Sequence, residues 1–309
     1  MSTNSSRSYP QLMARLMGTG ALAFPTWAYT LFFFLIPVAM VFYYSFGYKP
    51  DLFNPVATDS LSFDRYQEAL SIPVVNALIN TLEISISGTL ACLLIALPFA
   101  YWLATKVSPR RRNLLLALVM VPFWTNFLVR TLGWQIMLAP EGFLSDLLLH
   151  LHVLEQPLGI LYSRAAVQLG VIYNYLPLMI LPLYVALEST GSQLREASRD
   201  LGAGRVRTFM DVTLPLAMPG VISGCLLVFI PLNGDYVTAS VLGGARGTMV
   251  GQLIAQQFTT AQNWALGSAL AVILILTTVL VVLLGAVLLK LASWLYHRFS
   301  DIHLEVSAS

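Results

Sequence analysis

The sequence has few charged residues. Only 10% of its 309 residues are Asp, Glu, Lys or Arg, against roughly 25% in soluble proteins. Hydrophobic residues make up 57% of the chain. A chain of this composition cannot cover a globular surface with polar groups, which excludes a soluble enzyme, a disordered chain and a nucleic-acid-binding protein. Most of the chain must therefore face lipid, and we expect an all-α integral membrane protein.

Cysteine and lysine are also scarce. Cys92 and Cys225 both lie in apolar stretches, so neither a disulfide nor a cysteine-based metal site is expected. The three lysines stand at 49, 106 and 290, and none follows a glycine-rich phosphate-binding loop. We expect no catalytic residue, metal or cofactor in this chain. If ATP and magnesium drive its activity, a separate subunit must bind them.

The few charges divide the sequence into apolar segments. A transmembrane helix needs about 20 apolar residues to cross the hydrocarbon core. The first segment is longer than the roughly 7–15 apolar residues of a signal peptide, so we expect it to be retained. Arg130 interrupts the third segment. We predict a six-span domain over 21–290, between an N-terminal segment 1–20 and a tail 291–309, with spans near 21–46, 84–105, 114–138, 165–187, 212–234 and 267–289.

Lysine and arginine are distributed unevenly among the connections. Twelve lie in the two termini and in the second and fourth connections, whereas four lie in the other three connections. Cytoplasmic loops carry the excess of these residues. The sequence therefore predicts that the N and C termini are both cytoplasmic.

The connection 188–211, ESTGSQLREASRDLGAGRVRTFMD, has the pattern of a short amphipathic helix. Leu194, Ala197, Ser198 and Leu201 fall on one helical face. Ser192 is expected to cap the start of this helix, and Gly202 to take the left-handed position after its end. The residues alone leave two roles open. The helix either lies on the membrane surface or offers its small-residue face to a cytoplasmic partner.

The same connection resembles the signature loop of ABC importer permeases, which reads Glu-Ala-Ala, three residues, Gly, nine residues, Ile-x-Leu-Pro. The chain has EASRDLG at 196–202 and, nine residues later, VTLP at 212–215, departing from the pattern only at Ser198 and Val212. The resemblance implies a coupling helix that sits in a groove of an ATPase subunit. The small side chains allow close approach and the charged ones can pair at the rim. The residues implied are Leu194, Arg195, Glu196, Ala197, Ser198, Arg199 and Gly202.

Other segments resemble permeases of the spermidine/putrescine importer class, most clearly 214–244, 251–258 and 263–271, and more weakly 122–134 and 80–85. The resemblance implies the type I permease fold of a binding-protein-dependent importer in the bacterial inner membrane. It also implies a second permease subunit, two ATP-binding subunits and a periplasmic solute-binding protein as partners. Another organic cation, an amino-acid-like compound or an anion remains open as the solute. A secondary transporter driven by an ion gradient is a further alternative.

Polar groups near the span ends are candidates for the solute pathway. An ionisable group in hydrocarbon is costly, so it usually faces protein or a water-filled cavity. Carboxylates could replace part of the water that an entering cation loses, and aromatic rings and amides could face an ammonium. Each could equally be an interfacial anchor, a belt aromatic or, for Arg130, a snorkelling side chain. The candidates are Glu83, which opens the second span, Trp124, Asn126, Tyr173, Asn174, Tyr175, Asn233, Asp235 and Tyr236.

Overall fold

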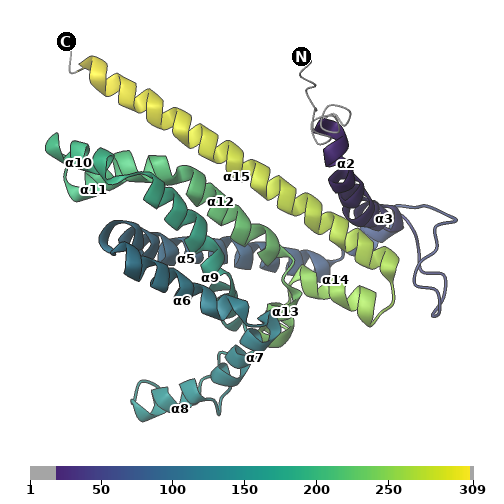
Figure 1. Ribbon diagram of the computed structural model, residues 1–309. Helices are drawn as coiled ribbons and strands as arrows, with labels where there is room; N and C mark the ends of the chain where they lie inside the picture. Colours follow the sequence, from purple (N-terminus) through teal and green to yellow (C-terminus); the bar gives the residue numbers. More distant parts are fainter. Residues whose placement is uncertain (1–18, 307–309) are drawn as a thin grey trace, which may run out of the picture.

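The computed structural model describes residues 19–306, with side chains for 24–291, and nearly all of these residues are helical. Within this part of the chain the predicted all-α fold is confirmed (Figure 1). The helices are α2 (Thr19–Thr30), η1 (Leu31–Leu35), α3 (Ile36–Tyr44), α4 (Asp64–Ala69), α5 (Ile72–Lys106), α6 (Pro109–Trp124), α7 (Phe127–Leu138), α8 (Phe143–His150), α9 (Arg164–Ser189), α10 (Ser192–Asp200), α11 (Arg205–Thr208), η2 (Phe209–Thr213), α12 (Leu214–Asn233), α13 (Tyr236–Thr238), η3 (Ala239–Gly243), α14 (Val250–Thr259) and α15 (Trp264–Val306).

Five helical segments among the described residues are long and apolar enough to cross a membrane. A sixth span is present if α6 and the α7–α8 segment are taken together, and this pair is bent by 87° at its break. The predicted count of six therefore stays a prediction. The five segments are Phe24–Tyr44, Ile72–Lys106, Arg164–Ser189, Arg205–Asn233 and Trp264–Leu291.

The predicted third span, 114–138, is wrong as one continuous helix. Thr125 and Asn126 have extended backbone, with ψ of 155° and 136°, and they separate α6 from α7. The Asn126 side chain accepts hydrogen bonds from the backbone N–H of Leu128 at 2.8 Å and of Val129 at 3.4 Å. Such a cap starts a new helix. The apolar run therefore folds as two helices at nearly a right angle.

Two other spans extend beyond their predicted bounds. α5 begins well before the predicted 84–105, and its 35 residues are about 52 Å long at 1.5 Å per residue. α15 continues past the predicted end at 289 through most of the predicted tail. Both helices are longer than the roughly 30 Å hydrocarbon core, so each must project beyond it. Of the predicted segment 1–20, only the last two residues are among those described.

The core lies where α5, α9 and α12 pack together. Leu103, Val171, Leu183 and Val228 are fully buried there. Close approach of α12 to α9 requires Gly220, because a Cβ at this position would lie 2.3 Å from the Cβ of Ala186. Small residues commonly allow such contacts between membrane helices.

α15 packs mainly against α14, α3 and α4 and forms a smaller cluster of its own. Figure 1 shows it as the long helix along one side of the molecule, with α3 and α14 near its start. In the first and last candidate spans, 0% and 11% of the most apolar window is buried within the chain. These two helices therefore offer their surfaces to lipid or to another subunit.

Candidate functional site

The predicted coupling loop contains a short helix with a tight stop. After α10, the Gly202 amide donates to the Arg199 carbonyl at 2.8 Å and the Ala203 amide to the Ser198 carbonyl at 3.1 Å. Gly202 has a φ of 85°. This pair of bonds around a left-handed glycine is a Schellman motif. The predicted role of Gly202 in ending the helix is confirmed.

The start of α10 differs from the prediction. Gly191, with a φ of 68°, holds the N-cap position, and Ser192 is the first helical residue rather than the cap. A left-handed φ favours glycine, and no side chain caps this end. Both ends of α10 therefore have a glycine in a left-handed backbone conformation.

The two faces of α10 differ in their surroundings. Ser192, Arg195, Glu196 and Arg199 line a small hollow of about 110 Å³ against the end of α5. The apolar side chains point elsewhere: Leu194, Ala197 and Leu201 are exposed, Leu201 by 90%. The predicted coupling helix thus leaves an apolar surface of small residues that does not pack against the other helices. Ser198, the fourth predicted member of that face, is an exception: it is half-buried, and its hydroxyl oxygen lies 3.2 Å from that of Thr208.

Arg112 joins three helix ends next to this loop. Its guanidinium forms an ion pair with Glu188 at the end of α9. The same group donates to the carbonyls of Ala104 at 3.3 Å and Val107 at 3.4 Å, at the end of α5. Glu188 lies four residues before α10, so the loop is attached to a braced part of the bundle. On its other side, α11, η2 and α12 run on as one helical segment into the core.

Asp235 lies at the opposite end of α12, in the break before α13. It is 5% exposed, and Thr238 donates to its carboxylate from the backbone N–H at 2.9 Å and from the hydroxyl at 2.6 Å. Asp235 therefore caps α13, a structural role. The buried Tyr175 ring of α9 reaches the neighbourhood of the same carboxylate. A carboxylate has more lone pairs than these two bonds use, so it can still accept from a ligand.

Two buried asparagines border this region. Asn233 donates to the Phe229 carbonyl at 2.7 Å, and Asn174 donates to the Thr131 hydroxyl at 3.2 Å. Neither side-chain oxygen receives a hydrogen bond from the described residues. Buried polar atoms are normally satisfied, so each of these two oxygens calls for a donor such as a water molecule or a ligand. The structure thus brings the predicted residues Tyr175 and Asp235 close together, and the predicted Asn174 and Asn233 are buried one and two residues away from them along the chain.

The other predicted pathway residues do not join this group. Glu83 lies inside α5 rather than at the opening of a span, and it pairs with Arg164 at 2.7 Å. Asn126 is committed to capping α7. Tyr173 contacts the Trp134 ring edge-on, with centroids 5.4 Å apart. The two remaining residues are more than half exposed, and they are Trp124 and Tyr236.

Arg130 forms no ion pair among the described residues. Its guanidinium lies 5.6 Å from the ring centroids of both Phe123 and Phe127, a cation–π arrangement. Phe127 in turn contacts the Tyr175 ring, with centroids 6.0 Å apart. Aromatic packing rather than a carboxylate accommodates this charge.

Sequence reasoning missed a row of buried hydroxyls on α5. Thr81, Ser85 and Thr89 are spaced by four residues, so they share one helix face, and all are buried. Thr81 accepts from the Val250 amide at 2.9 Å, and the neighbouring Asn80 donates to the Thr248 carbonyl at 2.6 Å. These bonds attach the 245–253 segment to α5. The four-residue spacing within an apolar helix was the signal that could have revealed the row.

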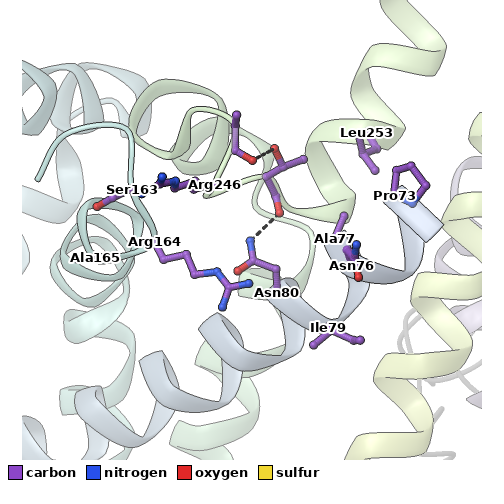
Figure 2. Close-up of a pocket in the computed structure, with 12 residues that line it drawn as sticks. Pro73, Asn76, Ala77, Ile79, Asn80, Ser163, Arg164, Ala165, Arg246 and Leu253 are labelled. Carbon is purple, nitrogen blue, oxygen red and sulfur yellow. Dashed lines mark hydrogen bonds between the residues drawn. The ribbon is translucent and has the colours of Figure 1, made fainter.

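A cleft of about 840 Å³ opens beside this attachment. Figure 2 shows Arg164, Arg246 and Asn80 around it, from three different segments. The first belongs to α9, the second to the turn before α14, and the third to α5. A glutamate is near, since Glu83 pairs with Arg164, but it does not line the cleft.

The family described as "Binding-protein-dependent transport system inner membrane component" matches residues 96–300, more than half of the chain. The chain belongs to this family. Its members are components of transport systems rather than enzymes, and the several apolar helices of this chain agree with a multi-pass membrane protein.

Several curated proteins are similar to the chain. The spermidine/putrescine transport system permease protein PotB of Escherichia coli (strain K12) is 40% identical over 213 residues, which are 69% of this chain and 77% of PotB. PotB of Haemophilus influenzae is 41% identical over 245 residues, which are 79% of this chain and 85% of that protein. The inner membrane ABC transporter permease protein YdcU of Escherichia coli is 29% identical over 73% of this chain and 75% of its own length.

A solved structure shares the fold. It is a crystal structure of a bacterial ABC transporter involved in the import of the acidic polysaccharide alginate. One of its chains aligns with a TM-score of 0.68 and 16% identity, over 90% of this chain and 94% of that chain. The predicted ABC importer permease fold is thereby confirmed. At this identity the match says nothing about the solute.

Proposed function

We propose that the chain is the transmembrane permease subunit of an ATP-driven, binding-protein-dependent importer of the polyamines putrescine and spermidine, in the bacterial inner membrane. The observation that carries the proposal is the 40% identity to the PotB permease over 69% of the chain. The spacing of the 196–215 loop, which matches the signature of ABC importer permeases, and the exposed apolar face of α10 support it.

The working assembly contains more than this chain. It pairs with a second permease subunit, sits on two ATP-binding subunits that hold ATP and magnesium, and receives solute from a periplasmic solute-binding protein. The chain itself binds no cofactor and hydrolyses nothing. Support comes from the largely unburied surfaces of the first span and α15, which leave room for lipid and for a second permease.

α10 transmits the movement of the ATP-binding subunits. Leu194, Ala197 and Leu201 dock in a groove of one of them, where small and apolar side chains allow close approach. When ATP closes the ATP-binding pair, α10 is displaced. The helical run α11–η2–α12 then moves with it, because Ser198 of α10 bonds Thr208 of α11 and no loop separates α11, η2 and α12. The spans alternate between inward-open and outward-open states around a pathway between the two permeases.

The α10 end faces the cytoplasm, and both termini lie on that side. This orientation rests on the charges at that end. Lys106 ends α5 and the three arginines 110–112 lie in the first turn of α6, while four more arginines lie between α9 and α12. An excess of this kind is typical of the cytoplasmic side.

The solute passes near Asp235 on the opposite side. A polyamine carries several ammonium groups, and the buried Asp235 carboxylate with the adjacent Tyr175 ring offers charge and an aromatic face. The side-chain oxygens of Asn174 and Asn233 supply further acceptors. The predicted residues Glu83, Trp124, Asn126, Tyr173 and Tyr236 are not part of this group, and their place in the pathway stays a prediction.

Uptake by the complete importer tests this function. The complex is reconstituted in proteoliposomes with ATP inside, binding protein outside and labelled spermidine. We expect uptake that requires both ATP and binding protein and that unlabelled putrescine competes for. Uptake that persists when the ATP-binding subunits are omitted would favour an ion-gradient transporter. Uptake of an organic anion or amino acid in place of spermidine would show that the proposed solute is wrong, while the proposed importer function would stand.

A further inference from the structure

The cleft beside α5 concentrates positive charge on the side of the molecule opposite α10, where lysine and arginine are otherwise scarce. The three connections opposite the α10 end hold four lysines and arginines. Two of the four, Arg164 and Arg246, line this one cleft. Lys49 instead donates to the Ala261 carbonyl at 2.7 Å, and Arg65 forms an ion pair within its own helix.

Arg246 is the less compensated of the two cleft arginines. It is exposed and has no ion pair among the described residues, whereas Arg164 pairs with Glu83. The start of α9 adds the partial positive charge of a helix N-terminus to the same cleft. The cleft therefore attracts a negatively charged group and repels a polyamine, so it is distinct from the solute path near Asp235.

The side-chain oxygen of Asn80 is an unsatisfied acceptor, which indicates that a ligand binds in this cleft. The side chain is 3% exposed, and its nitrogen donates to the Thr248 carbonyl at 2.6 Å. A carbonyl only accepts, so this bond fixes which end of the amide is the oxygen. That oxygen has no hydrogen-bond donor among the described residues, and Asn80 lines the cleft. Figure 2 shows Asn80 on the side of the cleft that Arg164 borders.

The cleft thus combines donors with one unsatisfied acceptor, and this combination selects the occupant. A polyamine offers only donors. A fully deprotonated inorganic anion such as sulfate offers only acceptors and leaves the Asn80 oxygen unsatisfied. A protein segment with an acidic side chain offers both, because its carboxylate accepts from arginine and its backbone N–H donates. A volume of about 840 Å³ is large enough for such a segment.

We propose that this cleft is the docking site for an acidic segment of the soluble solute-binding protein. A carboxylate of that segment pairs with Arg246, and a backbone N–H donates to the Asn80 oxygen. The proposal rests on the proposed function, because it needs a binding protein that approaches from the side opposite α10. It adds to that function the surface and the chemistry of recognition.

Titration of the binding protein tests the proposal. The complete complex is placed in phosphatidylcholine nanodiscs, and ATP hydrolysis is followed as solute-loaded binding protein is added. We expect Arg246→Glu to raise the half-saturating concentration about tenfold and Arg246→Gln to raise it less. Salt should weaken docking less in Arg246→Gln than in the wild type, since one charge pair is gone. Lys49→Gln, the loss of a half-buried cation on the same side of the molecule, should keep the wild-type value.

Other results would overturn the proposal in recognisable ways. An unchanged half-saturating concentration in Arg246→Glu would show that no acidic segment docks in the cleft. Loss of the second permease on purification of this variant would assign the cleft to the contact between permeases. An effect that appears only with phosphatidylethanolamine would assign it to a lipid headgroup. If the binding protein did not stimulate ATP hydrolysis by the wild-type complex at all, the proposed function itself would be wrong. If it stimulated hydrolysis but spermidine were not taken up, the docking site would stand and only the proposed solute would be wrong.

Discussion

At the scale of single residues, Asp235 combines a structural role with the chemistry that a cation pathway needs. It caps α13 through Thr238, and yet it remains a carboxylate buried beside an aromatic ring. A buried carboxylate is costly, and a short three-residue helix could be capped by asparagine at less cost. The negative charge is therefore the property that capping does not explain.

Asp235→Asn separates these two roles. Asparagine keeps the size and the cap but removes the charge, and losing a charge-assisted hydrogen bond costs about 1.5–3 kcal/mol. We expect spermidine uptake to fall about tenfold or more, measured as the initial rate in proteoliposomes. The control is Thr238→Val, which removes the hydroxyl bond and keeps the charge. An equal loss of uptake in both variants would mean that Asp235 serves only the local fold.

At the scale of secondary-structure elements, the rigidity of α10 depends on how it ends. Gly202 has a φ of 85°, and a Cβ there would meet no atom within 4 Å. Gly202→Ala therefore adds only the cost of a left-handed backbone, about 1–2 kcal/mol. We expect the α10 end to fray and the ratio of spermidine imported to ATP hydrolysed to fall roughly fivefold.

Two further variants check this explanation. Gly204 has a φ of −66° and equally open surroundings, so Gly204→Ala should behave as the wild type. Asparagine tolerates the left-handed region better than alanine does, so Gly202→Asn should recover part of the coupling. A normal ratio of import to hydrolysis in Gly202→Ala would separate the Schellman motif from energy transmission.

The sequence was informative where one residue type determines the local geometry. Gly202 is an example, because a helix that ends on glycine is a strong pattern. The start of the same helix was misassigned to Ser192, since nothing in the sequence separates a serine cap from a glycine one step earlier. The prediction of the third span as one helix was wrong for another reason. Hydropathy averages over a window, and the capping Asn126 inside an apolar run carries little weight in it.

The candidate site was harder to predict than the fold, because it is assembled by packing between distant segments. Tyr175 and Asp235 meet only where α9 packs against α13, and Glu83 finds its partner Arg164 on another helix. Residue type alone nominated Tyr175, Asp235 and Glu83, but not Arg164. It could not tell which ones would meet, and it passed over Asn80 because α5 was expected to start later.

At the scale of the whole molecule, the structure has two candidate functional ends joined by one core. α10 lies at one end of α9 and α12, and Asp235 with the Arg246 cleft lies at the other (Figure 1). The shared core of α5, α9 and α12 is closely packed, with Gly220 against Ala186. A closely packed core moves as a unit rather than deforming continuously. Displacement of α10 can therefore reach the end that holds Asp235.

The most direct test of this account asks what α10 touches in the working importer. Ala197 is exposed on the free face of α10, so Ala197→Cys places a reactive thiol there. The measurement is cross-linking of this thiol to a cysteine in the ATP-binding subunit, in membranes that contain the complete complex. The account predicts a cross-link that stops spermidine uptake and that a reductant reverses. Labelling of the same thiol by a membrane-impermeant reagent outside intact cells, with no cross-link, would contradict it.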